Sequence, residues 1–339
     1  MIREEFITIV VQGDVRSNTK KLLLSIRKQV PHAKLIFSTF ANQVAAADRD
    51  GIDRLVDRFC LTDDPGPMPA TVNSPTAPPN NINRMLRSTQ LGLSRVTTPY
   101  ALKLRSDAEC DVLAIVKGWT DALGVADPET SNRLAFASHY TRHPHGINGY
   151  TFHVSDWMTF GRTLTVSDYW SAPRFTEEDA VWFDSHPLPP DVTATSRRFR
   201  AVFSQEQWLC VHYAKRKGYF TPSSVHDRAP EVVFSYQRFL SRECVILDVD
   251  AIRMHVPKQA WARRSSFQDM DCVSHQDWLV MSGRAPVDTK RDQRRALARR
   301  YRHQIARAVL LKKWINARWA SLTGRKAQVS EPMAAAPPP

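Results

Sequence analysis

The N-terminal part of the chain alternates between continuous apolar runs and segments whose apolar residues have helical spacing. Residues 6–11 (FITIVV) form a run typical of buried strands, and Gly13 ends it. In residues 19–30, leucine, isoleucine and valine recur at intervals of three and four, which predicts a helix that Pro31 ends. Residues 33–39 (AKLIFST) predict a second strand. This strand–helix–strand order predicts an α/β fold with a mostly parallel central sheet.

The pattern continues up to residue 105. Residues 52–66 predict a shorter third element, and a loop with five prolines follows at 67–79. Helical spacing returns at 82–96, and residues 98–105 (TPYALKLR) predict another strand. Ligands of open α/β sheets bind at the carboxyl ends of the strands, so the polar residues after residue 104 are candidates for a site.

The strand at 98–105 differs from an ordinary buried strand. Buried parallel strands are normally apolar throughout, yet this strand contains Lys103 and Arg105 and is followed by Asp107, Glu109 and Asp111. In one interpretation the two cations face a cleft, where they bind a ligand or balance Asp107. In the other, they extend to solvent from a half-exposed strand, and the acids belong to a solvated turn.

The second half of the chain shows a less regular pattern. Residues 132–143 predict a strand, and residues 147–170 predict a strand, a turn and the start of a helix. Residues 204–219 predict a helix that Gly218 ends, and residues 242–254 contain a late strand. We expect one domain over residues 1–285.

The formal net charge of the chain is +13, and it is concentrated near the C-terminus. Residues 288–326 contain thirteen basic and two acidic residues, a net charge of +11. Apolar residues recur among them, so we expect a basic amphipathic helical segment at 286–326 that binds an anionic membrane surface or packs on the domain. The low-complexity tail at 327–339 is expected to be disordered. Because the rest of the chain is nearly neutral, nucleic acid is not expected as a partner.

Apolar runs and cysteines indicate the cellular compartment of the protein. No apolar run reaches the length of roughly 20 residues that a membrane span needs, and the N-terminus lacks the pattern of a signal peptide. The five cysteines form no CxxC pair, which argues against a disulfide framework and a structural zinc site. We therefore expect a cytoplasmic protein, peripheral on the inner membrane face if the basic segment binds lipid.

Several motifs, in this order, resemble the WavE-type lipopolysaccharide-synthesis proteins. They are VVQGDV, NTKKLLLSIRKQVPHAKLIFSTF, DPG, NINRMLRSTQLGLSRVTTPYALKLRSD and SDWMTFG, within residues 5–220. The resemblance implies a GT-A-like glycosyltransferase with a Rossmann-like nucleotide-sugar half, residues 1–120, and an acceptor half, residues 121–285. It implies transfer of a sugar from a nucleotide-sugar donor to a lipopolysaccharide core or another surface glycan or glycolipid.

A looser comparison with GT-A enzymes implies roles for single residues. Their acidic triplet, Asp-x-Asp, holds Mg²⁺ or Mn²⁺ beside the diphosphate of the donor. In this chain the triplet is RSD, so Arg105 replaces the first Asp, Asp107 matches the last, and Glu109 is a candidate second carboxylate. Dependence on a divalent metal therefore stays open at this point.

The resemblance also implies a donor site and a catalytic base. The catalytic candidates are Glu206, at the acidic start of a helix, and Asp156, whose neighbour Trp157 is a candidate for stacking on a sugar ring. The donor-binding candidates are Gln12, Gly13, Asp14, Asp63, Asp64, Asn83, Arg84, Lys103, Arg105 and Asp107. Ordinary turns, helix starts and surface ion pairs also use such residues.

Two other classes of function stay open. The loss of one Asp from the triplet fits a catalytically inactive GT-A-like module that binds a glycan or a partner. The basic C-terminal segment fits a nucleic-acid-binding protein, whose affinity would fall steeply with salt.

Overall fold

The computed structural model describes residues 2–74, 76–124, 127–146, 149–189, 192, 196–259 and 267–288, with isolated positions up to 315. The chain divides into two units, Met1–Val287 and Asp288–Pro339. Most of the predicted amphipathic segment at 286–326, and all of the predicted disordered tail at 327–339, lie outside the described residues. The fold below is that of the first unit.

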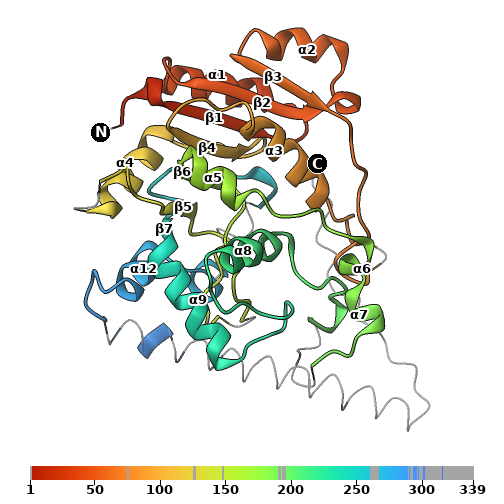
Figure 1. The fold of residues 1–339 in the computed structure, drawn as a ribbon, viewed down its shortest axis with the longest axis vertical. Coiled ribbons are helices and arrows are strands. Elements are labelled where there is room, and N and C mark those ends of the chain that lie inside the picture. Colours follow the sequence, from red (N-terminus) through yellow and green to blue (C-terminus); the bar gives the residue numbers. More distant parts are fainter. Residues whose placement is uncertain are drawn as a thin grey trace. The chain divides into compact units, whose positions relative to one another are not determined.

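A seven-stranded sheet with the order β3-β2-β1-β4-β6-β5-β7 forms the centre of this unit (Figure 1). The strands are β1 (Ile7–Gln12), β2 (Lys34–Phe40), β3 (Arg58–Thr62), β4 (Tyr100–Arg105), β5 (Leu134–Ala137), β6 (Met158–Arg162) and β7 (Cys244–Leu247). All neighbours are parallel except β6, which is antiparallel to both β4 and β5. The predicted α/β fold with a mostly parallel central sheet is therefore confirmed.

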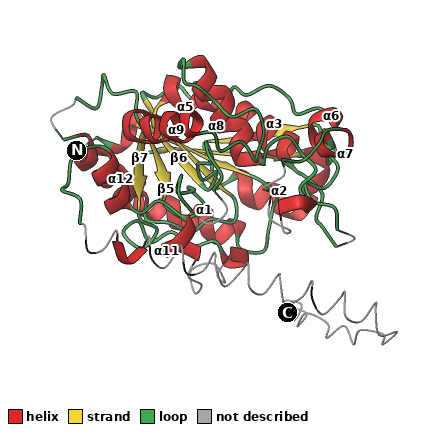
Figure 2. Ribbon diagram, turned by 90° about the horizontal axis from the view of Figure 1, so that it is seen from below, coloured by secondary structure: helices red, strands yellow, loops and turns green. Residues whose placement is uncertain are grey.

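Helices cover both faces of the sheet (Figure 2). One face carries α3 (Ile82–Leu93), α5 (Thr163–Tyr169), α8 (Gln205–Arg216) and α9 (Pro230–Glu243); the other carries α1 (Thr19–Gln29), α2 (Ala46–Asp53) and α4 (Val112–Leu123). The described residues also form the short helices α6 (Glu177–Ala180), α7 (Trp182–Ser185), α11 (Phe267–Asp271) and α12 (His275–Met281). Strands from both halves of the chain belong to one sheet, so the residue ranges 1–120 and 121–285 share one core.

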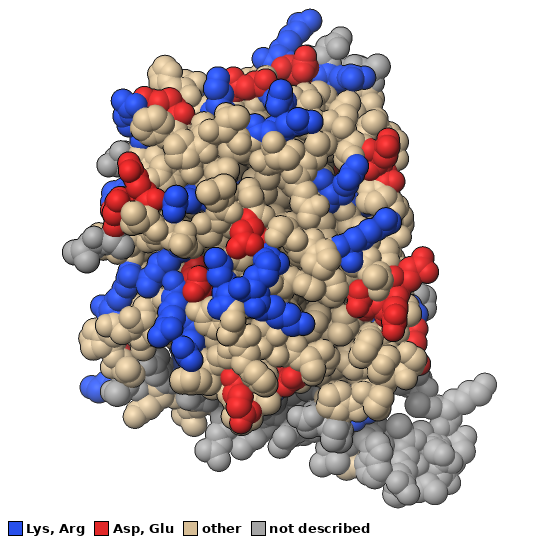
Figure 3. Space-filling view, viewed as in Figure 1, with Lys and Arg blue, Asp and Glu red and all other residues tan. Residues whose placement is uncertain are grey.

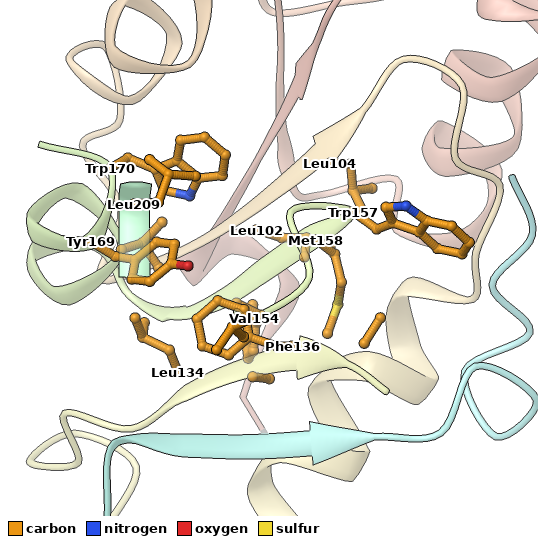
Figure 4. Close-up of a cluster of buried hydrophobic side chains, with 14 of the residues drawn as sticks. Leu102, Leu104, Leu134, Phe136, Val154, Trp157, Met158, Tyr169, Trp170 and Leu209 are labelled. Carbon is orange, nitrogen blue, oxygen red and sulfur yellow. The ribbon is translucent and has the colours of Figure 1, made fainter. Parts of the chain in front are cut away.

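Bulky side chains fill the space between β5, β6 and the helices α5 and α8 (Figure 4). Phe136 of β5 packs on Tyr169 at the end of α5, with ring centroids 5.0 Å apart, and Leu209 of α8 lies against the same cluster. These three residues are fully or almost fully buried. Burying large apolar side chains stabilises the fold and excludes water from this face of the sheet.

Basic side chains gather over α8 and α9 on the surface (Figure 3). Lys215, Arg216 and Lys217 end α8, and Arg238 and Arg242 lie on the exposed side of α9. Part of this charge is balanced, because Arg216 and Lys217 both lie close to Asp168. Basic residues are thus clustered on the first unit, at α8 and α9, in addition to those near the C-terminus.

Gly92 lets α3 pack closely on the strands β1 and β2. A Cβ atom at this position would lie 2.4 Å from Cγ1 of Val10 and 3.2 Å from Cβ of Ser38. Gly118 of α4 faces only the end of the Leu247 side chain, whose Cδ2 would lie 3.0 Å away. The valine is β-branched and fixed in a strand, whereas the leucine end can move.

We therefore expect Gly92→Ala to lower the free energy of unfolding by about 1–3 kcal/mol through overpacking. Gly118→Ala is the matched control, since alanine is favoured over glycine in a helix by about 1 kcal/mol and the clash there is avoidable. Urea unfolding measures both variants. Equal losses of stability in the two variants would contradict this account of the α3 packing.

Candidate active site

A polar cavity of about 390 Å³ lies at the carboxyl ends of β1 and β4. The chain runs from β1 outward to β2 and β3 and then returns to β4 on the other side of β1, so the strand order reverses between β1 and β4. Such a switch point is where open α/β sheets bind ligands. We call this the switch-point cavity; of the predicted site residues, it is lined by Gln12, Gly13, Asp14, Arg84, Arg105, Asp107 and Asp156.

The ends of β1 and β4 are held together by Ser106. Its backbone N–H donates to the carbonyl of Gln12 at 2.8 Å, and its hydroxyl donates to the carbonyl of Asp14 at 2.8 Å. Gly13 has a φ of +130°, and a Cβ atom there would lie 2.6 Å from Oγ of Ser106. Only glycine allows this turn and this close approach. The turn brings Gln12 and Asp14 to the cavity wall.

Arg105 joins two carboxylates in the cavity. Its Nε and Nη2 donate to Oδ1 and Oδ2 of Asp107 at 2.9 and 3.0 Å, and its Nη1 lies 3.2 Å from Oδ2 of Asp156. Burial opposes the charge of Arg105, but Asp156 and Asp107 outweigh it and raise the pKa of the guanidinium above its ordinary value. The interpretation in which Arg105 balances Asp107 agrees with this geometry.

Lys103 lies behind the cavity and does not line it. The side chain is fully buried, its Nζ donates to the backbone carbonyl of Asp156 at 2.6 Å, and it lies 4.3 Å from the ring centroid of Trp170. Burial lowers the pKa of this ammonium to about 7, although Asp156 opposes the shift. The alternative that Lys103 extends to solvent from a half-exposed strand is wrong. The predicted contact of Lys103 with a donor would require movement of this buried side chain.

The pKa of the Glu206 carboxyl is well above its ordinary value. It lies in the first turn of α8, after the capping residue Ser204, and its side chain is 22% exposed. Burial, followed by the charge of Asp156, raises the pKa of Glu206 to about 7. A group with such a pKa exchanges protons readily near neutral pH, as a general base requires.

His153 contacts Glu206 but forms no ion pair with it near neutral pH. Its Nε2 lies 3.6 Å from Oε2 of Glu206, and its Nδ1 lies 3.0 Å from the carbonyl of Tyr140. Burial, together with the nearby Arg142, lowers the pKa of His153 to about 3. The ring is therefore neutral at pH 7, and no cation at this position opposes protonation of Glu206.

Asp63, Asp64 and Asn83 line a neighbouring cavity of about 420 Å³. Asp64 accepts from Nε and Nη2 of Arg84, both at 2.7 Å, and the side chain of Arg84 reaches the wall of the switch-point cavity. The Asn83 amide is buried and exchanges two hydrogen bonds with the backbone of Phe175. Asp64 and Asn83 thus have structural partners, and Arg84 is the member of this group that faces the switch-point cavity.

The three acidic residues that follow β4, Asp107, Glu109 and Asp111, lie at three different places in the structure. Asp107 lines the switch-point cavity, whereas Glu109 pairs through its backbone with His255 and lines a different cavity of about 420 Å³. Asp111 caps α4, since its Oδ1 accepts from the backbone N–H of Ala114 at 2.9 Å. The predicted pairing of Asp107 and Glu109 around a metal ion is therefore not formed by this arrangement.

The donor set at Asp107 does not fit a divalent metal ion. Both of its oxygens accept from Arg105, and no group of three or more His, Cys, Asp or Glu that could hold a metal occurs among the residues described by the structure. Mg²⁺ and Mn²⁺ require several oxygen ligands around one point. In this site, the point between Asp107 and Asp156 is held by a guanidinium group.

Several residues that line the cavity were not predicted from the sequence. Arg16, Ser106, Gln205 and Gln259 also line the switch-point cavity. Gln205 directly precedes the predicted Glu206, so the start of this helix was a signal for it in the sequence. Gln259 belongs to a distant 3₁₀ turn, Pro257–Gln259, which carries no motif. Trp157 is only 3% exposed, so it is not available for the expected stacking on a sugar.

Another cavity, of about 540 Å³, lies between α4, β7 and α12. Its lining includes Gly118, Leu247 and Leu279, with Asp248 and Arg284, and it contains none of the predicted site residues. Since seven of the predicted site residues line the switch-point cavity instead, that cavity is the candidate active site.

The fold and this cavity define a Rossmann-like α/β protein with a charged cavity at the switch point of its sheet. The chain belongs to the WavE lipopolysaccharide synthesis family, which matches residues 7–314. This confirms the resemblance found in the sequence motifs. None of the curated proteins matches the sequence. In the part of the chain that the structure describes, no helix is both long and apolar enough to cross a membrane.

The chain is also similar to several solved structures. Rv0371c from Mycobacterium tuberculosis H37Rv has 15% sequence identity, with 56% of this chain and 87% of that chain covered and a TM-score of 0.30. HddC from Yersinia pseudotuberculosis has 11% identity, coverages of 48% and 79%, and a TM-score of 0.28. A glycosyltransferase involved in the glycosylation of the major capsid of PBCV-1 has 14% identity, coverages of 55% and 79%, and a TM-score of 0.28. These likenesses are too distant to carry an argument about the site.

Replacement of Glu206 should change how stability depends on pH. The pKa of Glu206 is about 7 in the folded protein against an ordinary value of 4.5, so the folded protein retains a proton that the unfolded chain loses between these values. Ionising Glu206 therefore costs stability as pH rises through this window. Glu206→Gln removes that cost. We expect its free energy of unfolding to increase relative to the wild type as pH rises from 4.5 to about 7.

Urea unfolding across this pH window measures the effect. Glu178→Gln is the matched control, because Glu178 is exposed in the first turn of α6. A difference between Glu206→Gln and the wild type that does not change with pH would show that the folded state does not hold a proton on Glu206.

Proposed function

We propose that this protein is a glycosyltransferase that moves a sugar from a nucleoside-diphosphate sugar to a lipopolysaccharide core or another surface polysaccharide acceptor. The observation that supports this most directly is the switch-point cavity, whose wall contains three guanidinium groups. Glu206 does not line this cavity, but its pKa of about 7 responds to the charges of Asp156 and Arg105 in the cavity wall. Membership of the WavE lipopolysaccharide synthesis family supports the class of acceptor.

The donor would lie along the ends of β1 and β4. Gln12 and Asp14 offer an amide and a carboxylate to the base and ribose hydroxyls, at the strand end where Gly13 allows close approach. Arg84, held by Asp64, and Arg105 offer N–H groups to phosphate oxygens. Guanidinium groups bind phosphates well, since their planar N–H groups match pairs of phosphate oxygens.

Glu206 is the proposed general base, and Asp156 is proposed to position the site. Asp156 is paired with Arg105, and its backbone carbonyl accepts from Lys103, so its charge and place hold the network together. Glu206 is more exposed, at 22% against 5%, and has a raised pKa. A base must both reach the acceptor hydroxyl and exchange its proton near the working pH.

The proposed reaction is a single displacement. The acceptor oxygen bonds to the anomeric carbon of the donor sugar while its proton passes to the carboxylate of Glu206. The bond between the anomeric carbon and the phosphate oxygen breaks, and its electron pair leaves with the nucleoside diphosphate. The arginines of the cavity stabilise the negative charge that develops on this leaving group.

Transfer can be tested with purified protein, radiolabelled UDP-, GDP- and dTDP-sugars, and lipopolysaccharide from cells that lack this protein. We expect label to pass from one of the donors to the acceptor. Asp107→Ala should abolish this transfer, since it releases Arg105 from its position. Donor binding without transfer to any acceptor would favour the alternative, a binding module with no catalytic activity.

The two candidate bases should differ in their kinetic effects. We expect Glu206→Gln to lower kcat by about 10²–10⁴-fold with little change in the KM of the donor, because a base acts in the transition state. Asp156→Asn should raise the KM of the donor more than Glu206→Gln does, since it frees Arg105. A larger fall in kcat for Asp156→Asn than for Glu206→Gln would assign the base to Asp156.

The pH profile separates the base from Lys103, whose pKa is also about 7. For the wild type, kcat should rise with pH through about 7, because Glu206 must lose its proton to act. The profile of Glu206→Gln should lack this rise. If the rise persists in that variant, the titrating group is not Glu206.

A further inference from the structure

Two carboxylates from distant parts of the chain meet on one guanidinium group in the switch-point cavity. Asp107 follows β4, and Asp156 precedes β6. Arg105 donates to both oxygens of Asp107 at 2.9 and 3.0 Å, and its Nη1 lies 3.2 Å from Asp156. The place between the two carboxylates is therefore held by a cation that belongs to the chain itself.

A divalent metal ion placed between these two carboxylates would occupy the position of the Arg105 guanidinium and would be repelled by its charge. The two acids are 9% and 5% exposed, and breaking a largely buried ion pair leaves charges without compensation. Glu109, the nearest further carboxylate in sequence, lines a different cavity. The site thus does not fit a metal ion, because the guanidinium of Arg105 lies between the two carboxylates and Glu109 does not join them.

Arg105 is more accessible to a ligand in the cavity than the two carboxylates that it contacts. The side chain of Arg105 is 22% exposed and lines the cavity, while its two partners are more enclosed. A guanidinium group has five N–H bonds, two of them on each terminal nitrogen. The contact with Asp107 uses one N–H on Nη2, so an N–H of this nitrogen remains for a phosphate oxygen.

Two more guanidinium groups line the same cavity. Arg84 is fixed by its bidentate contact with Asp64, and Arg16 is 44% exposed beside Asp14. A diphosphate in the cavity would therefore lie among three guanidinium groups of the cavity wall, those of Arg16, Arg84 and Arg105. Charge-assisted hydrogen bonds from arginine to phosphate are short and strong, and they need no metal ion.

We propose that Arg105, together with Arg84 and Arg16, binds the diphosphate of the donor, so that donor binding and transfer require no divalent cation. This inference rests on the proposed function, since it names what holds the leaving group in that reaction. As the bond to the sugar breaks, its electron pair adds negative charge to the diphosphate, and the guanidinium of Arg105 stabilises that charge.

The first test uses the wild-type protein and needs no variant. Isothermal titration measures the binding of UDP, GDP and dTDP in EDTA and again with Mn²⁺ or Mg²⁺. We expect at least one nucleotide to bind with affinities that agree within about threefold in the two conditions. Binding that disappears in EDTA and returns with the metal ion would overturn the inference while leaving the proposed function intact. No binding in either condition, together with no transfer, would overturn both.

The second test changes the cation. Arg105→Ala should weaken nucleotide binding by about 10–100-fold, and Arg105→Lys should recover part of the loss, because it keeps the charge but not the planar fork. Arg200→Ala is the matched control, since Arg200 pairs with Asp184 and does not line the cavity. Circular dichroism shows whether each variant is folded.

Arg105→Asp gives the sharpest result, because it restores an acid at the first position of the triplet. We expect this variant to lose nucleotide binding in EDTA and to recover it with Mn²⁺, whereas the wild type is insensitive to both. If Arg105→Ala and Arg105→Lys, both folded, bind the nucleotide as tightly as the wild type does, Arg105 does not hold the diphosphate.

Discussion

The position of Arg105 between Asp107 and Asp156 is the interaction on which the geometry of the candidate site depends. One guanidinium group joins the end of β4 to the segment before β6, and Lys103 adds a hydrogen bond to the backbone of the same segment. Charges as enclosed as these are costly unless they are paired and hydrogen-bonded. The pairing therefore fixes where the two carboxylates and the guanidinium lie relative to the cavity.

The antiparallel direction of β6 is what brings Asp156 to this place. Met158, the first residue of β6, lies opposite Leu104 near the end of β4. In a parallel strand, the residues after the strand would lie at this edge, and Asp156 would lie at the opposite edge of the sheet. A single reversed strand thus adds residues from the second half of the chain to a site that begins with β1 and β4.

Burial changes the protonation of several groups around the site. It raises the pKa of Glu206 to about 7, lowers that of Lys103 to about 7 and lowers that of His153 to about 3. The apolar cluster around Tyr169 and Trp170 excludes water from this side of the sheet, and electrostatic effects are stronger where water is excluded. The same packing that stabilises the fold therefore sets the proton affinities that the proposed chemistry needs.

The sequence by itself determined the α/β class, the first strands and helices, and the polar strand ends at Gln12–Asp14 and Arg105–Asp107, because apolar periodicity and turn residues are local signals. The family motif SDWMTFG added Asp156, and the comparison with GT-A enzymes added Glu206. Only the tertiary structure decided which of these groups lie together. In the structure Glu109 lines a different cavity from Asp107, the Asn83 amide donates to the backbone of Phe175, and Lys103 is buried. Such outcomes depend on strand direction and on contacts between residues far apart in the chain, and neither leaves a pattern in the local sequence.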